Sequence, residues 1–165
     1  MQYMNKLALN PIVNRVIRYF DFLIDRGFEV SNASSFLELF GNWFVEFESP
    51  DCFLVIFSDR DEVLVRMYPI KTDRNIVTDL GFMVYFLSNG QVFIGPEEEN
   101  LVGGAKKQLE RSARLLEEYI DRIVPYFGQG FEKNKEDLIA ATKKFDSFQL
   151  EKYGLQTLKG RVKGL

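Results

Sequence analysis

Histidine is absent from this chain of 165 residues, and cysteine occurs once, at Cys52. The missing imidazole removes the commonest metal ligand and the commonest general base at neutral pH, and a lone cysteine forbids an intramolecular disulfide. No run of about 18 apolar residues is present to span a bilayer, and the first residues lack the charged-then-apolar layout of a signal peptide. We therefore expect a cytoplasmic protein without a membrane anchor, and we predict no metal and no cofactor.

The composition is typical of one globular domain. Hydrophobic residues make up 46% of the chain and charged residues 27%, with 24 acidic and 21 basic side chains. This is enough apolar material for a sizeable core. We predict a single domain over residues 1–165, with residues 1–9 and 155–165 frayed or flexible.

Charge is divided unevenly along the chain. Residues 151–165 hold four basic side chains against Glu151, a local balance of +3, so the total of −3 leaves −6 for residues 1–150. An acidic body repels phosphate backbones. Nucleic acid is therefore a disfavoured partner, and the basic tail is interpreted as solvated.

Helical periodicity dominates the first part of the chain. Apolar residues recur at three- and four-residue steps over residues 10–26, which predicts an amphipathic helix with Asn10 as its N-cap, Pro11 in its first turn and Gly27 at its exit. Residues 31–35 have the composition of a loop. Residues 36–40 fit a short helix or a strand equally well.

The middle of the chain is rich in strand-forming residues. Residues 43–49, 52–58 and 62–68 form three such runs joined by short polar connections, which predicts an antiparallel meander. The second run is apolar on both of its faces. Such a strand needs cover on both sides, so we expect helices over one face of the sheet and further chain over the other.

The rest of the chain favours helices. Residues 76–87 fit either a buried helix that begins at Asp79 or a fourth strand interrupted by Gly81, and we favour the helix. Residues 104–127 and 134–153 have clear helical spacing. The predicted fold class is α+β, with an antiparallel β-meander of three to five strands packed against an N-terminal helix and two C-terminal helices.

No residue is predicted to be catalytic. Cys52 is the only thiol, but no histidine is available to activate it, so we interpret it as a buried strand residue. Glu46 and Glu48 share one face of a strand, about 6.6–7 Å apart along it. Such a pair is compatible with acid/base hydrolysis, with cation binding or simply with a solvated face.

Acidic and aromatic residues are the candidates for a protein-binding surface. Carboxylates speed association with a basic partner, and aromatic side chains dominate the energetics of interfaces. Trp43 and Phe131 also fit the core, with Trp43 favoured there. The candidate partner-binding residues are Glu46, Glu48, Trp43, Glu97, Glu98, Glu99 and Phe131.

One helix start combines backbone donors with lysines. Gly103 and Gly104 precede Lys106 and Lys107 at the beginning of the predicted helix over residues 104–127, an arrangement that is able to hold an anion. The pattern lacks the phosphate-loop and dinucleotide-binding signatures. It supports an alternative function in binding a small anionic ligand.

A broad resemblance covers residues 10–127. The chain resembles a class of small uncharacterised bacterial α+β proteins, some of which are similar to immunity proteins of polymorphic toxin systems. The resemblance implies a cytoplasmic bacterial protein that works by binding, and it supplies no catalytic residue. The likeness is carried by Asp25-Arg26-Gly27-Phe28 at the end of the first helix, by Phe44-Val45-Glu46-Phe47-Glu48-Ser49-Pro50 with the following run over residues 53–63, and by Gln108-Leu109-Glu110 and Leu115-Leu116-Glu117-Glu118-Tyr119.

The leading hypothesis is therefore a non-enzymatic protein-interaction module, either an immunity-type inhibitor or an adaptor, with a protein as its partner. The alternatives are a small-ligand protein that binds an anion at Gly103 and Gly104, and a carboxylate-based hydrolase. Whether the chain forms a homo-oligomer stays open.

Overall fold

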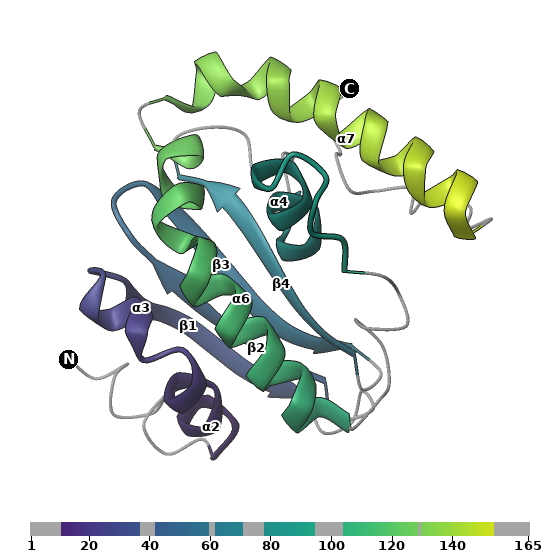
Figure 1. Ribbon diagram of the computed structural model, residues 1–165. Coiled ribbons are helices and arrows are strands. Elements are labelled where there is room, and N and C mark those ends of the chain that lie inside the picture. Colours follow the sequence, from purple (N-terminus) through teal and green to yellow (C-terminus); the bar gives the residue numbers. More distant parts are fainter. Residues whose placement is uncertain are drawn as a thin grey trace.

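The computed structural model describes residues 11–36, 42–59, 62–70, 78–94, 104–128 and 130–153 (Figure 1). The predicted α+β class is confirmed, with one antiparallel sheet and helices on it. The strands are β1 (Glu29–Phe36), β2 (Asn42–Glu48), β3 (Cys52–Asp59), β4 (Glu62–Pro69) and β5 (Thr78–Asp79), and the helices are α2 (Pro11–Tyr19), α3 (Phe22–Asp25), α4 (Leu80–Leu87), α6 (Gly104–Phe127) and α7 (Phe131–Tyr153).

The sheet is a meander whose five strands follow one another in the order of the sequence. Every neighbouring pair is antiparallel. The predicted strand runs are confirmed to within a residue at each end, and the count lies at the upper end of the expected three to five. Because successive side chains of a strand point to opposite faces, the sheet separates its residues into two sets.

Helices cover one of these two faces, which we call the inner face. Figure 1 shows α6 lying across it, with α2 and α3 on one side of α6 and α4 on the other. α6 contacts β3 and β4, α2 contacts β2, and α4 contacts β4. The core lies between these layers, and its fully buried members include Phe47, Leu54, Ile56 and Met67 from the strands. Their burial from water drives the helices onto the sheet.

The last helix packs mainly on other helices. α7 contacts α4 and α6, and it lies outside α4 in Figure 1. Its anchor is the buried Phe145, whose ring lies 5.6 Å from Phe82, 4.9 Å from Tyr85 and 5.9 Å from Phe93, centroid to centroid. α7 begins at Phe131, three residues earlier than predicted.

The loop predicted over residues 31–35 is wrong, because these residues belong to β1. The strand pairs with β2 along its whole length, apart from an irregularity between Val30 and Asn32. β1 is an edge strand, and serine and asparagine are tolerated there because part of the strand faces solvent. Of the ambiguous residues 36–40, Phe36 ends β1 and the others lie outside the described residues.

The first predicted helix is divided in two. α2 ends at Tyr19 and α3 begins at Phe22, so the chain bends where one continuous helix was expected. Gly27 then follows α3 with a φ of +81°, which favours glycine and confirms its role at the exit. The expected N-cap, Asn10, lies outside the described residues.

Of the ambiguous residues 76–87, Leu80–Leu87 form the helix that we favoured, and Thr78–Asp79 form the short strand β5. Residues 76 and 77 lie outside the described residues. Asp79 is the N-cap of α4, and its Oδ1 accepts a 2.7 Å hydrogen bond from the backbone N–H of Phe82. This bond satisfies an amide that the helix itself leaves without a partner. Within the described part of the chain, no helix combines the length and apolarity needed to cross a membrane.

Candidate functional site: the outer face of the sheet

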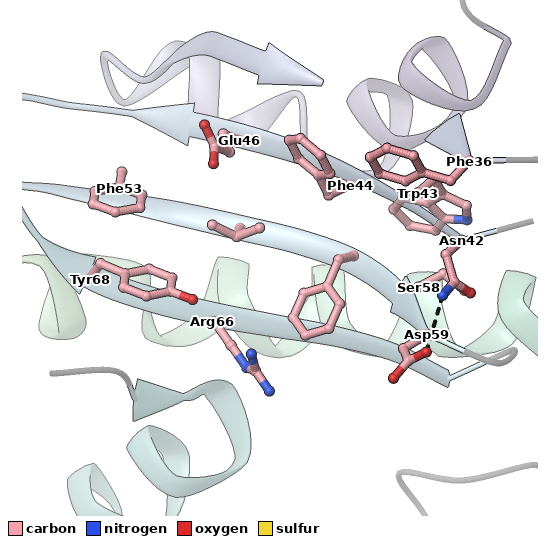
Figure 2. Close-up of a pocket in the computed structure, with 12 residues that line it drawn as sticks. Phe36, Asn42, Trp43, Phe44, Glu46, Phe53, Ser58, Asp59, Arg66 and Tyr68 are labelled. Carbon is pink, nitrogen blue, oxygen red and sulfur yellow. Dashed lines mark hydrogen bonds between the residues drawn. The ribbon is translucent and has the colours of Figure 1, made fainter. Parts of the chain in front are cut away.

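The face of the sheet turned away from the helices, which we call the outer face, holds the candidate site. The helices that contact strands do so on the inner face, and Figure 2 looks onto the outer face with α6 behind the strands. Strand pairing defines its members. They are Glu29, Asn32, Ser34 and Phe36 of β1, Asn42, Phe44, Glu46 and Glu48 of β2, Phe53, Val55, Phe57 and Asp59 of β3, Glu62, Leu64, Arg66 and Tyr68 of β4, and Asp79 of β5.

A hollow of about 620 Å³ lies on the outer face. This volume is within the range of small-molecule pockets. Glu46, Val55 and Arg66 form one row across three strands, because Val55 pairs with Glu46 on one side and with Arg66 on the other. The side chain of Val55 is smaller than those of its aromatic neighbours on β3, Phe53 and Phe57. The hollow is therefore deepest above Val55, between those two rings.

Aromatic rings form the walls of the hollow. Phe53 and Tyr68 stack with ring centroids 4.7 Å apart and planes 2° from parallel. At the other end, Phe36 and Phe44, which Figure 2 shows beside each other, have ring centroids 6.2 Å apart. Phe44, Phe57 and Tyr68 are only half-buried. Half-buried aromatic rings in a hollow of this size are a feature of protein-binding surfaces.

The charges of the outer face are mostly of one sign. Arg66 is the only cation among its described residues, and its guanidinium lies 4.7 Å from the centroid of the Phe57 ring. Asp59 accepts a 3.1 Å hydrogen bond from the Asn42 side-chain amide, and Asp79 caps α4. The carboxylates of this face are Glu29, Glu46, Glu48, Asp59, Glu62 and Asp79.

The sequence-predicted acidic pair is only partly brought to the hollow. Glu46 lines it and is half-buried, whereas Glu48 is exposed at the end of β2 and does not line it. Glu97, Glu98 and Glu99 lie outside the described residues. No group of three potential metal-ligating side chains occurs among the residues that the structure describes.

The two predicted aromatic contact residues are both buried. Trp43 is 9% exposed and belongs to the inner face, although it also lines the edge of the hollow. Phe131 is 2% exposed and stacks on Phe127 with centroids 6.3 Å apart. Phe131 therefore fills the core at the start of α7 and offers no surface to a partner.

Of the predicted anion site, the structure describes Gly104, Lys106 and Lys107. Gly104 begins α6 with a φ of +70°, while Gly103 lies outside the described residues. Lys106 and Lys107 are exposed on the first turn, and Lys106 lies 3.8 Å from Glu110 in the next turn. The described residues of this helix start therefore add only exposed lysines to the sequence pattern.

Cys52 is a core residue, as the sequence predicts. It points to the inner face and is fully buried. Burial raises the pKa of its thiol to about 12, with a smaller contribution from the nearby Asp51. A thiol with such a pKa holds almost no thiolate at neutral pH and is inert as a nucleophile.

Sequence reasoning missed Val55, Phe57, Arg66 and Tyr68 as site residues. The apolar character of both faces of residues 52–58 indicated an unusual second face, but only the pairing register shows which residues meet across the strands. Comparisons with models of protein families, with curated proteins and with solved structures give no significant match.

Proposed function

We propose that the protein is a non-enzymatic protein-interaction module of the bacterial cytoplasm, an immunity-type inhibitor or an adaptor, and that its partner binds on the outer face of the sheet. The observation that carries this proposal is the hollow of about 620 Å³ walled by half-buried aromatic rings on the face opposite the helices.

The energetics of the outer face support binding. Each half-buried ring still exposes apolar area, and covering such area stabilises a complex by about 25 cal/mol for each Å². The rings are also held in place before a partner arrives, because Phe53 stacks on Tyr68 and Phe36 on Phe44. A surface that is already ordered loses little side-chain entropy on association.

Two exposed apolar residues allow a matched test. Phe36 is 42% exposed on the outer face, and Ile24 is 44% exposed on α3, on the side of the helices. Replacing either by serine removes a similar exposed apolar side chain, so the two variants should lose similar stability. Only Phe36→Ser alters the proposed binding surface.

The experiment is affinity capture from nuclease-treated lysate with four baits: the wild type, Phe36→Ser, Val55→Lys and Ile24→Ser. We expect the wild type and Ile24→Ser to retain one protein in near-stoichiometric amount. Phe36→Ser should retain much less of it, and Val55→Lys, which places a cation in the hollow, should retain none. Equal retention by all four baits, or no retention by the wild type, would contradict the proposal.

A further inference from the structure

We infer that the occupant of the outer face is a basic protein segment, and that it places an arginine side chain in the hollow above Val55, with its guanidinium at Glu46 and against the aromatic walls. This inference rests on the proposed function and specifies the chemistry of its partner.

Charge complementarity is the first reason. The described residues of the outer face include several carboxylates, of which Glu46 and Asp59 line the hollow, and Arg66, which also lines it, is their only cation. A partner with positive charge is therefore attracted at long range, which raises its rate of association. A phosphate-rich partner is repelled by the same charges.

The position of Glu46 is the second reason. Its half-buried side chain lines the hollow, and it makes no ion pair or hydrogen bond with the described part of the chain. Arg66 lies two strands away, with β3 between them, so the backbones at Glu46 and Arg66 are roughly 9–10 Å apart. A carboxylate without a partner beside apolar rings favours a guanidinium, which binds it through paired hydrogen bonds.

The aromatic walls are the third reason. A guanidinium is weakly hydrated and stacks on aromatic faces, which an ammonium does less well. The outer face already contains one such contact, because the Arg66 guanidinium lies 4.7 Å from the centre of the Phe57 ring. Val55, between Phe53 and Phe57, is an apolar surface on which the methylene groups of an incoming arginine can lie while its guanidinium reaches Glu46.

A second copy of this chain fits the outer face poorly. Two outer faces brought together would oppose the carboxylates of Glu46, Glu48 and Glu62 to those of the other copy. The single arginine of each copy would offset only part of this repulsion. A basic segment of another protein meets no such repulsion.

The test uses three acetylated and amidated peptides of equal length that differ at one repeated position: one that repeats Arg-Thr-Ser, one with citrulline in place of arginine, and one with glutamate. Citrulline keeps the shape of arginine but lacks its charge. Binding is followed by amide chemical shifts, which give both the affinity and the face that is contacted. The variants are Glu46→Gln, Arg66→Gln and, as a matched control on the exposed side of α6, Glu118→Gln.

We expect the arginine peptide to shift outer-face residues and to bind at least about tenfold more tightly than the citrulline peptide. Glu46→Gln should weaken binding about fivefold, because the neutral amide no longer pairs with the guanidinium. Arg66→Gln should strengthen it about two- to threefold, because a like charge is removed. Glu118→Gln should leave the affinity unchanged.

Opposite effects of Glu46→Gln and Arg66→Gln distinguish specific recognition from general attraction to an acidic protein. Equal binding of the citrulline peptide on the outer face would overturn the inference but leave the proposed function standing. Tighter binding of the glutamate peptide, or shifts confined to other surfaces, would also overturn it. A sedimentation experiment that shows a dimer lost in Val55→Lys would assign the face to a second copy instead.

Discussion

The inner and outer faces of the sheet use the same strands but meet different surroundings. On the inner face, Phe47, Ile56 and Met67 are fully buried beneath helices. On the outer face, Phe44 and Phe57 are half-buried, and carboxylates stand among the rings. The comparison teaches that one alternating pattern produces two different faces. Every second residue is buried under helices, and the residues between them form the face on which we propose that a partner binds.

The largest predicted difference between the two faces is the loss of stability caused by Phe47→Ala compared with that caused by Phe57→Ala. Phe47 is fully buried on the inner face, so its truncation removes a large side chain and leaves a cavity, which costs about 3–5 kcal/mol of unfolding free energy. Phe57 is half-buried, so the same change there should cost roughly 1–2 kcal/mol. Urea denaturation of both variants measures the difference.

Equal costs for the two phenylalanine variants would show that the outer face is packed as tightly as the inner one. Phe53→Ala is the matched intermediate case, because its buried ring stacks only 4.7 Å from Tyr68. Its cost should lie between those of Phe57→Ala and Phe47→Ala.

A second prediction concerns a buried polar contact between a helix and the sheet. The buried Gln108 of α6 accepts a 2.7 Å hydrogen bond from the backbone N–H of Val63 in β4. Gln108→Leu would leave that buried N–H without its acceptor, at a cost of about 1–3 kcal/mol. Chemical denaturation of the wild type and the variant gives the cost. A stable leucine variant would show that the contact contributes nothing.

The smallest predicted effect is a dependence of stability on pH through Cys52. Its pKa is raised to about 12 in the folded protein, against about 8.5 for an exposed thiol. Above pH 8.5 the unfolded chain therefore binds fewer protons than the folded one, and stability falls as pH rises towards 12. Between pH 8.5 and 9.5 the fall should be about 1 kcal/mol.

Cys52→Ala provides the comparison for this effect. The stability that the wild type has in excess of the variant should shrink steadily between pH 8.5 and 10, because only the wild type has the thiol. A constant difference over that interval would mean that the thiol titrates in the folded protein as freely as in the unfolded one.

Much of the architecture could be predicted from local patterns. The spacing over residues 104–127 and the strand-forming runs identified α6, β2, β3 and β4, and Asp79 indicated the start of α4. β1 was missed because serine and asparagine favour loops on their own, and its strand conformation comes from pairing with β2. The bend at Asp21 was missed as well, because the helical spacing of apolar residues continues on both sides of it.

The candidate site was harder to predict than the fold. Glu46 was identified from its strand position, but its row with Val55 and Arg66 depends on the register of three strands. Phe131 was a candidate contact residue that also fitted the core, and it stacks on Phe127 in the core. Local sequence shows which face of a strand a residue occupies, but not which residues from other strands lie beside it.

The most direct test of the central claim is the rate at which a maleimide labels Val55→Cys in a Cys52→Ala background, with and without the captured partner. We predict rapid labelling of the free protein, because the hollow is open, and strong protection in the complex. Ile24→Cys in the same background should label equally in both states. Slow labelling of Val55→Cys in the free protein, or an unchanged rate in the complex, would contradict the assignment of the outer face as the binding surface.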